Sequence, residues 1–171
     1  MAADLVHYIL FAMFPVAMAY AAASDLLTMT ISNRLTLGLV AGFVVLAPLT
    51  GMDWRTFGMH WAAGGAVLTL AFFCFAMGWI GGGDAKLGAA IALWLGWSSA
   101  IEFIGIASLL GGALTLILLA FRRSVVPVFI IRQPWVQRLH DDKAGVPYGI
   151  ALAIAGLATY PHSIWMRVAV G

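Results

Sequence analysis

Two aspartates, Asp25 and Asp84, are the residues best suited to chemistry, because each lies at the end of a long apolar run. A carboxylate is mildly unfavourable at the C-terminal end of a helix, where Asp25 is expected, so packing alone does not account for it. Two carboxyl groups held close together tend to share one proton. The ionised group can then accept a proton from water while the protonated group hydrogen-bonds a peptide carbonyl. This pair predicts peptide hydrolysis of the aspartic protease type.

Three glycines, Gly81, Gly82 and Gly83, directly precede Asp84. They have no side chains to keep a substrate backbone away, and they adopt positive φ at little cost. A protease must hold its substrate extended, often beside a strand-like segment. We therefore expect a flexible loop at 81–83 that contacts the substrate. The alternative is a glycine-rich turn that only packs helices, with Asp84 and Lys86 as an interface ion pair.

The composition indicates the elements that must position these residues. Of the 171 residues, 63% are hydrophobic and 9% are charged, and the mean hydropathy is +1.00. These values are far from those of a soluble domain. Nearly all of the apolar runs approach or exceed the roughly 20 residues that span a bilayer, and they lie at 5–24, 35–52, 56–83, 87–101, 103–121 and 144–166. The sequence predicts an all-α membrane protein, a bundle of six transmembrane helices that forms a single domain over residues 1–171.

The fourth and fifth runs are separated only by Glu102. One helix over both runs would extend about 50 Å, which is too long for a single crossing. We therefore predict a tight turn at 96–99, which makes the fourth helix short and places one of its ends in a protein-lined cavity. Glu102 is then expected to cap the fifth helix or to complement its dipole.

The basic residues predict the orientation. With the N-terminus outside, the cytoplasmic segments hold Arg34, Lys86, Arg122, Arg123, Arg132, Arg138 and Lys143, whereas the outside segments hold Arg55 and Arg167. This bias favours the N-terminus-outside orientation. Two crossings separate Asp25 from Asp84, so both are expected at the cytoplasmic face. The segment 122–143 is either partly interfacial, near anionic lipid, or a plain solvated loop.

Cofactors and nucleic acid are not expected. The formal net charge of +2 is too small to indicate nucleic-acid binding. The chain has one cysteine, Cys74, and its four histidines are scattered without ligand spacing. We therefore expect no metal site. Gly145 and Gly149 have the small-xxx-small spacing of helix contacts, and packing is their preferred explanation.

Three segments together resemble the type IV prepilin peptidases, which are GxGD aspartic proteases of the bacterial inner membrane. Gly-Gly-Gly-Asp-Ala-Lys-Leu at 81–87 is similar to the GxGD signature of that family. Ser-Asp at 24–25, followed by Ile-Ser-Asn-Arg-Leu at 31–35, is similar to its first aspartate segment. Gly-Val-Pro-Tyr-Gly at 145–149 resembles the Pro-Tyr-Gly element that opens the last helix. The three elements occur in the family's order, each at a predicted cytoplasmic helix end.

The resemblance implies that Asp25 and Asp84 are the catalytic pair. We assign substrate binding to Gly81, Gly82, Gly83, Lys86 and Asn33. Lys86 could also favour the ionised form of a nearby carboxylate, or hold a lipid phosphate. Pro147 and Tyr148 are expected to shape the start of the last helix, and helices two to four are expected to form the cleft.

The implied substrate is a prepilin or pseudopilin, whose basic leader is removed at the cytoplasmic face just before a hydrophobic helix, with glycine before the cut. Pilus or secretion components are possible further partners. Two departures matter. Ser32 replaces the proline that is expected in the first aspartate segment. The chain also lacks the cysteine-bearing insertion of the larger members, so N-methyltransferase activity is not expected. Its size resembles that of the small peptidases of Flp/Tad pilus systems.

Three other readings stay open. Asp25 and Asp84 could line a cation or proton path in a small transporter. A scaffold subunit of a secretion complex would make both aspartates dispensable. Presenilin-like proteases also use a GxGD loop, but their first aspartate usually follows a tyrosine, whereas Ser24 precedes Asp25 here.

Overall fold

The computed structural model describes the chain over residues 2–170, and its side chains over residues 8–167 apart from 10 and 128. This described chain is helical and contains no strand. The elements are α1 (Ala2–Thr28), α2 (Asn33–Leu49), α3 (Trp54–Ala76), α4 (Gly82–Arg122), α5 (Val128–Ile131), α6 (Pro134–His140), α7 (Tyr148–Thr159), the 3₁₀ helix η1 (Tyr160–His162) and α8 (Ile164–Val170). The predicted all-α class is confirmed.

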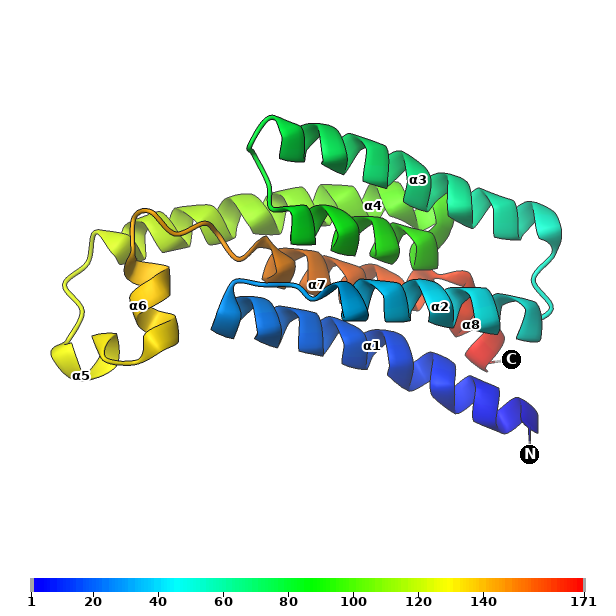
Figure 1. The fold of residues 1–171 in the computed structure, drawn as a ribbon. Coiled ribbons are helices and arrows are strands. Elements are labelled where there is room, and N and C mark those ends of the chain that lie inside the picture. Colours follow the sequence, from blue (N-terminus) through cyan, green and yellow to red (C-terminus); the bar gives the residue numbers. More distant parts are fainter. Residues whose placement is uncertain (1, 171) are drawn as a thin grey trace.

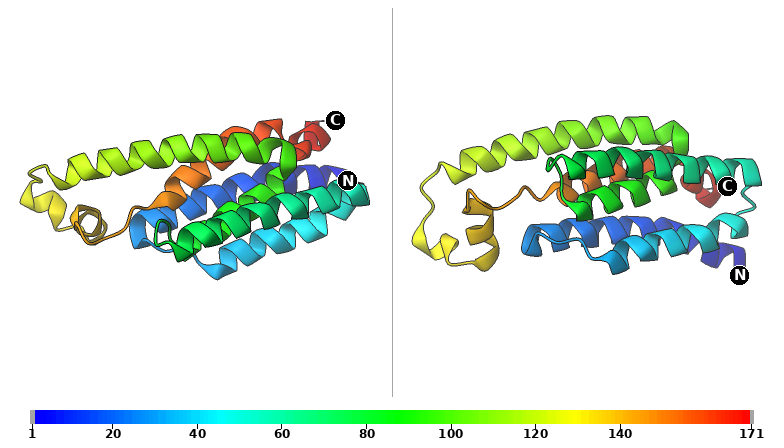
Figure 2. Two further views of the ribbon diagram at one scale, coloured as in Figure 1. Left: turned by 90° about the horizontal axis from the view of Figure 1, so that it is seen from above. Right: turned by 45° about the horizontal axis from the view of Figure 1, so that its top comes forward.

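The long helices lie side by side and form an elongated bundle (Figures 1 and 2). α4 packs against α2, α3 and α7, while α1 packs against α2, α7 and α8. Both chain ends lie at one end of the bundle (Figure 1). The links at 29–32 and 77–81, together with the start of α7, lie toward the other end, which we call the site end. The short helices α5 and α6 lie beyond it.

Gly96 divides α4 into two arms. Its φ of 73° and ψ of 176° are not helical, and the first arm (82–95) and the second arm (97–122) run in opposite directions (Figure 2). The predicted turn is therefore confirmed. A Cβ atom on residue 96 would lie 2.7 Å from Nε2 of His60, so the turn needs glycine for space as well as for its positive φ. Nδ1 of His60 donates a 2.8 Å hydrogen bond to the carbonyl oxygen of Leu93 at the end of the first arm.

We expect Gly96→Ala to lower the free energy of unfolding by more than about 1–2 kcal/mol, because left-handed backbone alone costs a side chain that much and the contact with His60 adds to it. Denaturant or thermal unfolding in detergent micelles measures the change. Gly105→Ala in the second arm is the matched control, since a Cβ atom there meets nothing within 4 Å. Equal stability of the two variants would show that the turn does not require glycine.

Three helices in the described chain are long and apolar enough to cross a membrane: α1 over Phe11–Thr28, α3 over its whole length, and α4 over Gly82–Arg122, which includes both arms. α2 is apolar but shorter. Large apolar side chains on these helices, among them Phe72, Leu109 and Leu116, are exposed, as contact with lipid requires. These features are those of a membrane protein. Six crossings and an outside N-terminus stay predictions.

The C-terminal part of the chain differs from the single helix predicted over 144–166. α7 begins only at Tyr148 and ends at Thr159, and the chain then continues through η1 into α8. Pro161 lies in η1, where its missing amide hydrogen and fixed φ interrupt the α-helical pattern. Ser163 is extended, with φ of −73° and ψ of 162°, and separates η1 from α8.

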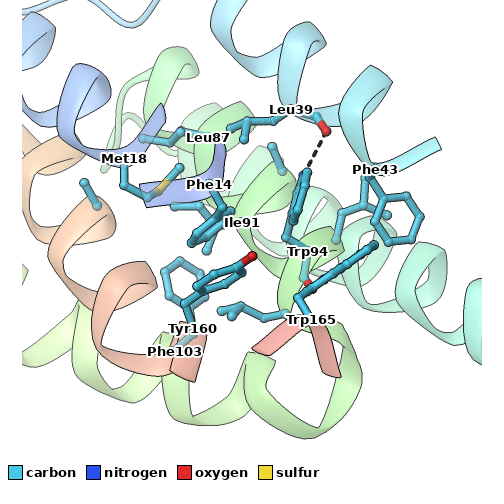
Figure 3. Close-up of a cluster of buried hydrophobic side chains, with 14 of the residues drawn as sticks. Phe14, Met18, Leu39, Phe43, Leu87, Ile91, Trp94, Phe103, Tyr160 and Trp165 are labelled. Carbon is cyan, nitrogen blue, oxygen red and sulfur yellow. Dashed lines mark hydrogen bonds between the residues drawn. The ribbon is translucent and has the colours of Figure 1, made fainter. Parts of the chain in front are cut away.

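The core is built from aromatic and aliphatic side chains of α1, α2, both arms of α4, η1 and α8 (Figure 3). Trp94, in the first arm, is fully buried. Its Nε1 donates a 2.8 Å hydrogen bond to the carbonyl oxygen of Leu39 in α2 (Figure 3). Nε1 of Trp165 in α8 donates in turn to the carbonyl oxygen of Trp94. These bonds fix the first arm, which carries Asp84 in its first turn, against its neighbours.

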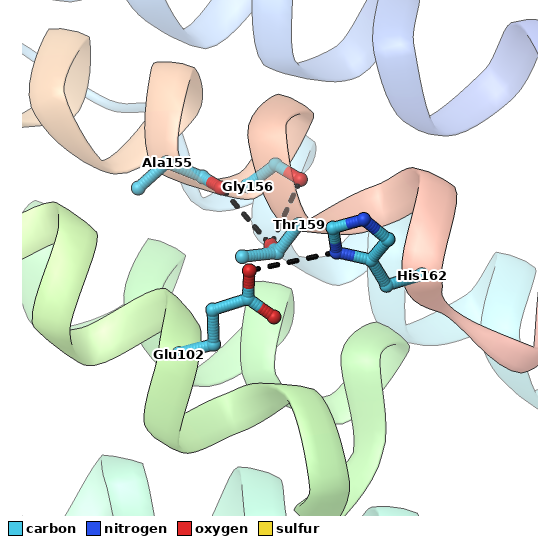
Figure 4. A network of polar contacts seen from close by, with 5 residues as sticks. All are labelled: Glu102, Ala155, Gly156, Thr159 and His162. Atoms are coloured by element: carbon cyan, nitrogen blue, oxygen red, sulfur yellow. Dashed lines mark hydrogen bonds and ion pairs between the residues drawn. The ribbon is translucent and has the colours of Figure 1, made fainter.

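Glu102 lies beyond the first turn of the second arm, so the predicted role as a cap or dipole partner is wrong. Its carboxylate lies 3.5 Å from Nδ1 of His162, and both side chains are partly exposed (Figure 4). Thr159 lies nearby and donates to the carbonyl oxygens of Ala155 and Gly156 within α7. An exposed pair of this kind contributes little to stability.

Candidate active site

Asp25 lies in the last turn of α1 and is almost fully buried, with 4% of its surface exposed. The helix ends three residues later, where Met29 adopts a positive φ of 55°. Ser24 stabilises this reversal, because its hydroxyl donates a 2.9 Å hydrogen bond to the carbonyl oxygen of Thr30. The carboxylate itself accepts a 2.7 Å hydrogen bond from the backbone N–H of Gly149 in α7. This bond joins α1 to α7, which are far apart in the sequence.

Asp84 lies in the first turn of α4. Its Oδ2 accepts a 3.2 Å hydrogen bond from the backbone N–H of Gly81, which is the N-cap residue. A carboxylate at this position satisfies a free amide and interacts favourably with the helix dipole. The side chain is only partly buried, so Asp84 is the more accessible of the two aspartates.

The two carboxyl groups lie at the same end of the bundle, on helix ends that are linked through one side chain. Ile31, in the link between α1 and α2, helps to bring their helices together. A Cβ atom on Gly83 would lie 3.2 Å from Cβ of Ile31, and one on Gly149 would lie 2.8 Å from its Cδ1. The Ile31 side chain is thus in contact with the starts of both α4 and α7. Asp25 and Asp84 thus lie at the same end of the bundle, as the number of crossings between them predicts.

The three glycines before Asp84 do not form the flexible, positive-φ loop that we predicted. Gly81 has φ of −73° and ψ of 148°, while Gly82 and Gly83 are already helical. Their missing side chains instead allow close packing within the protein. A Cβ atom on Gly81 would lie 2.8 Å from Oδ2 of Asp84, and one on Gly82 would lie 3.3 Å from the ring of Phe75. Gly81 is exposed and remains accessible from outside the bundle.

Lys86 and Asn33 contact each other. Nζ of Lys86 donates a 3.0 Å hydrogen bond to Oδ1 of Asn33, which joins α4 to the start of α2. Within the described residues, Lys86 forms no ion pair with a carboxylate, so the alternative pair between Lys86 and Asp84 is absent. Two residues correspond to about 200° around a helix, which explains why Lys86 and Asp84 point to different sides of the first arm.

Two grooves flank the first arm. The Asp84 groove, of about 420 Å³, lies between α3, both arms of α4 and α7, and Asp84 and Tyr148 are among its lining residues. The Lys86 groove, of about 440 Å³, lies between α2, α3 and the first arm, and Lys86 and Asn33 are among its lining residues. The cleft predicted between helices two to four therefore exists as the Lys86 groove. The Asp84 side chain, however, lines the Asp84 groove and not this one.

Gly149 and two arginines are site residues whose contacts the sequence reasoning missed. A Cβ atom on Gly149 would lie 2.7 Å from Oδ2 of Asp25, so this glycine packs against the carboxylate, whereas Gly145 meets nothing within 4 Å. The preferred packing explanation is therefore confirmed for Gly149, which allows α7 to approach α1 closely, and is wrong for Gly145. The resemblance of 145–149 to the Pro-Tyr-Gly element was the one sequence signal that pointed to this segment. It could not show that a backbone amide contacts Asp25.

The two arginines hold the segment between α4 and α7 in place through hydrogen bonds to backbone carbonyl oxygens. Arg122, in the last turn of α4, donates to the carbonyl oxygens of Leu139, Ala144 and Gly145 over 2.8–2.9 Å. Arg138, in α6, donates to the carbonyl oxygen of Leu27 near the end of α1. The segment that leads into Gly149 is thus bonded both to α4 and to the helix that carries Asp25. In the part of the chain that the structure describes, no group of three metal-ligating side chains gathers.

The fold and this end of the bundle define a helical membrane protein with two carboxyl groups at one end. The chain belongs to the type IV leader peptidase family, because the family's sequence profile matches residues 12–116, more than half of its length. The matched region contains both Asp25 and Asp84. Membership implies a protease and a prepilin substrate. The chain has no significant match among curated proteins or among solved structures.

Proposed function

We propose that the protein is an aspartic endopeptidase that removes the basic leader of type IV prepilins or pseudopilins at the cytoplasmic membrane face. The observation that supports this most is the position of Asp25 and Asp84 at one end of the bundle, on helix ends that Ile31 and Gly149 link, in a chain of a leader peptidase family. The proposal includes a single domain over residues 1–171 with six crossings and the N-terminus outside.

In the proposed reaction the two carboxyl groups share one proton before substrate binds. The ionised carboxylate takes a proton from water as the water oxygen attacks the scissile carbonyl carbon. The protonated carboxyl group gives its proton to the carbonyl oxygen, which forms a tetrahedral diol. The diol then loses a proton to the carboxylate, the C–N bond breaks, and the leaving nitrogen takes the proton held by the other carboxyl group.

The backbone amides have a definite part in this scheme. The N–H groups of Gly149 and Gly81 each donate to one of the carboxylates. Hydrogen bonds from backbone amides stabilise a charged carboxylate and fix its orientation. Each aspartate therefore keeps its position whichever of them is ionised, which the reaction needs because the proton changes sides.

We assign the remaining predicted residues to the polar part of the substrate. Gly81 is exposed beside Asp84 and allows the extended backbone around the cut to approach. Lys86 and Asn33 are exposed near the same end, and the ammonium group of Lys86 has donors left beyond its bond to Asn33. We further propose that the protein serves a pilus system of the Flp/Tad type. In the cell, we expect it in the cytoplasmic membrane beside pilus or secretion components.

The proposal is tested by co-expression with candidate prepilins in bacterial membranes, with loss of the leader followed by mass spectrometry. We expect cleavage after the glycine that precedes the hydrophobic helix. A prepilin in which this glycine is replaced is the matched control and should stay intact. If a well-folded protein cleaves none of several prepilins, the peptidase proposal fails. Ion-flux assays in liposomes would then test the transporter reading.

Lys86→Met should reduce kcat/KM only about 2–10-fold, because it removes one exposed hydrogen bond worth about 0.5–1.5 kcal/mol and no partner of a carboxylate. Lys86→Arg, which keeps the charge and the donors, should retain most of the activity. Cleavage kinetics in detergent micelles compare both variants with the wild type. A loss as large as that from an aspartate substitution would instead place Lys86 in the chemistry.

A further inference from the structure

The Asp84 groove has the form expected of a site for an apolar helix. Asp84 is at one end of it, and the groove follows the second arm of α4 from Phe103 to Gly112, about 13 Å of helix. Val67, Leu70 and Cys74 of α3 form the facing wall. The long axis of the groove therefore runs along the bundle, away from the carboxylate and into the apolar part of the protein.

The walls of the groove present few polar groups to an occupant. The hydroxyl of Tyr148 is engaged, because it lies 3.2 Å from the hydroxyl oxygen of Thr115. Small residues line the second arm at Ala107, Gly111 and Gly112. In membranes, helices associate through close packing against small residues, since burial of apolar surface from lipid provides little gain. The groove thus favours a helix over an extended polar peptide.

We propose that the hydrophobic helix of the prepilin binds in the Asp84 groove during cleavage. This inference rests on the proposed function, in which the cut directly precedes that helix. The helix must then begin within reach of Asp84 and continue along the bundle. The Asp84 groove starts at this carboxylate and continues in that direction.

The Lys86 groove does not meet the same requirement, although its volume is similar. The first arm of α4 stands between it and Asp84, and neither aspartate is among its lining residues. A helix in that groove would have to send its N-terminal end around the arm to reach the carboxyl groups. The two grooves therefore give opposite predictions for substitutions on the two faces of α3.

Leu70 and Leu68 provide a matched pair for the test. Leu70 lines the Asp84 groove and Leu68 lines the Lys86 groove, and both are exposed leucines on α3. We expect Leu70→Trp to reduce kcat/KM for prepilin cleavage at least tenfold, mainly through KM, because the indole fills the groove. Leu68→Trp should stay within about twofold of the wild type. Equal activity of the two variants, with the wild type active, overturns the docking proposal and leaves the proposed function standing.

A cross-linking experiment makes the test independent of cleavage. Cys74 is the single cysteine of the chain and lines the Asp84 groove. In the Asp84→Asn protein, a cysteine placed in the prepilin helix should form a disulfide with Cys74 when an added oxidant removes two electrons and two protons from the thiol pair. A Cys74→Ser, Leu68→Cys, Asp84→Asn protein is the control and should not cross-link.

The outcomes separate the two proposals. Cross-linking through Leu68→Cys and not through Cys74 overturns docking in the Asp84 groove, and so does the absence of a cross-link at Cys74 for every prepilin position tested. A wild-type protein that cleaves no prepilin overturns the proposed peptidase function. In that case the cross-link still decides whether the prepilin helix binds in this groove.

Discussion

Asp25→Asn and Asp84→Asn should each reduce prepilin cleavage at least about 10²-fold, because each removes one member of the proposed acid–base pair and such catalysis contributes about 10²–10⁴-fold per group. Effects of groups that act as a unit are not additive, so the double variant should be no slower than the slower single variant. Mass spectrometry of the prepilin after co-expression measures the loss directly.

Folding should survive these substitutions. Asparagine has nearly the size of aspartate, and its side-chain oxygen can still accept the N–H of Gly149 at position 25 or of Gly81 at position 84. Glu102→Gln is the matched control, because Glu102 is an exposed acid of the second arm that is paired with His162 and with neither aspartate. Its activity should equal that of the wild type. Cleavage retained by an Asp25 or Asp84 variant would remove that residue from the mechanism.

Gly149→Ala should reduce cleavage at least about tenfold. The added Cβ atom would lie 2.7 Å from Oδ2 of Asp25 and 2.8 Å from Cδ1 of Ile31, so the carboxylate or α7 must move. A displacement of about 1 Å at a catalytic group can cost about 10²-fold in rate. Overpacking of this kind also costs about 1–3 kcal/mol of stability. Cleavage kinetics and unfolding in micelles measure the two effects separately.

Gly145→Ala is the control for this variant, since a Cβ atom at position 145 meets nothing within 4 Å and the carbonyl that accepts from Arg122 is kept. It should match the wild type in both measurements. If Gly149→Ala unfolds like the wild type and cleaves at the same rate, the contact between Gly149 and Asp25 has no part in the activity.

The sequence alone predicted the features that depend on the number of membrane crossings and on the length of a helix. The number of crossings between Asp25 and Asp84 predicted that they share one end of the bundle. The length of the apolar stretch around Glu102 predicted a turn, and Gly96 was among the residues able to form it. Both arguments use the length of a helix, which is nearly independent of what packs around it.

The details of the site depended on packing, which the sequence does not encode locally. Gly81, Gly82 and Gly83 could serve a loop or a close helix contact equally well, and only the positions of Ile31 and Phe75 decide between these uses. The hydrogen bond to Asp25 comes from the backbone amide of Gly149, which nearly every residue type also has, so no sequence pattern predicts it. Arg122 and Arg138 were predicted as topology signals, whereas they also donate to backbone carbonyls that hold the site end together.

The first arm of α4 is short, and its burial decides what this means for the surrounding lipid. At about 1.5 Å per residue, the arm from 82 to 95 covers about 20 Å, whereas the 23 residues of α3 cover about 34 Å. The hydrocarbon layer is about 30 Å thick, so this arm is mismatched with it and α3 is not. Nearly all residues of this arm from Ala85 to Leu95 are buried, so protein side chains and not lipid surround it. The arm can therefore be shorter than the hydrocarbon layer without deforming the bilayer around it.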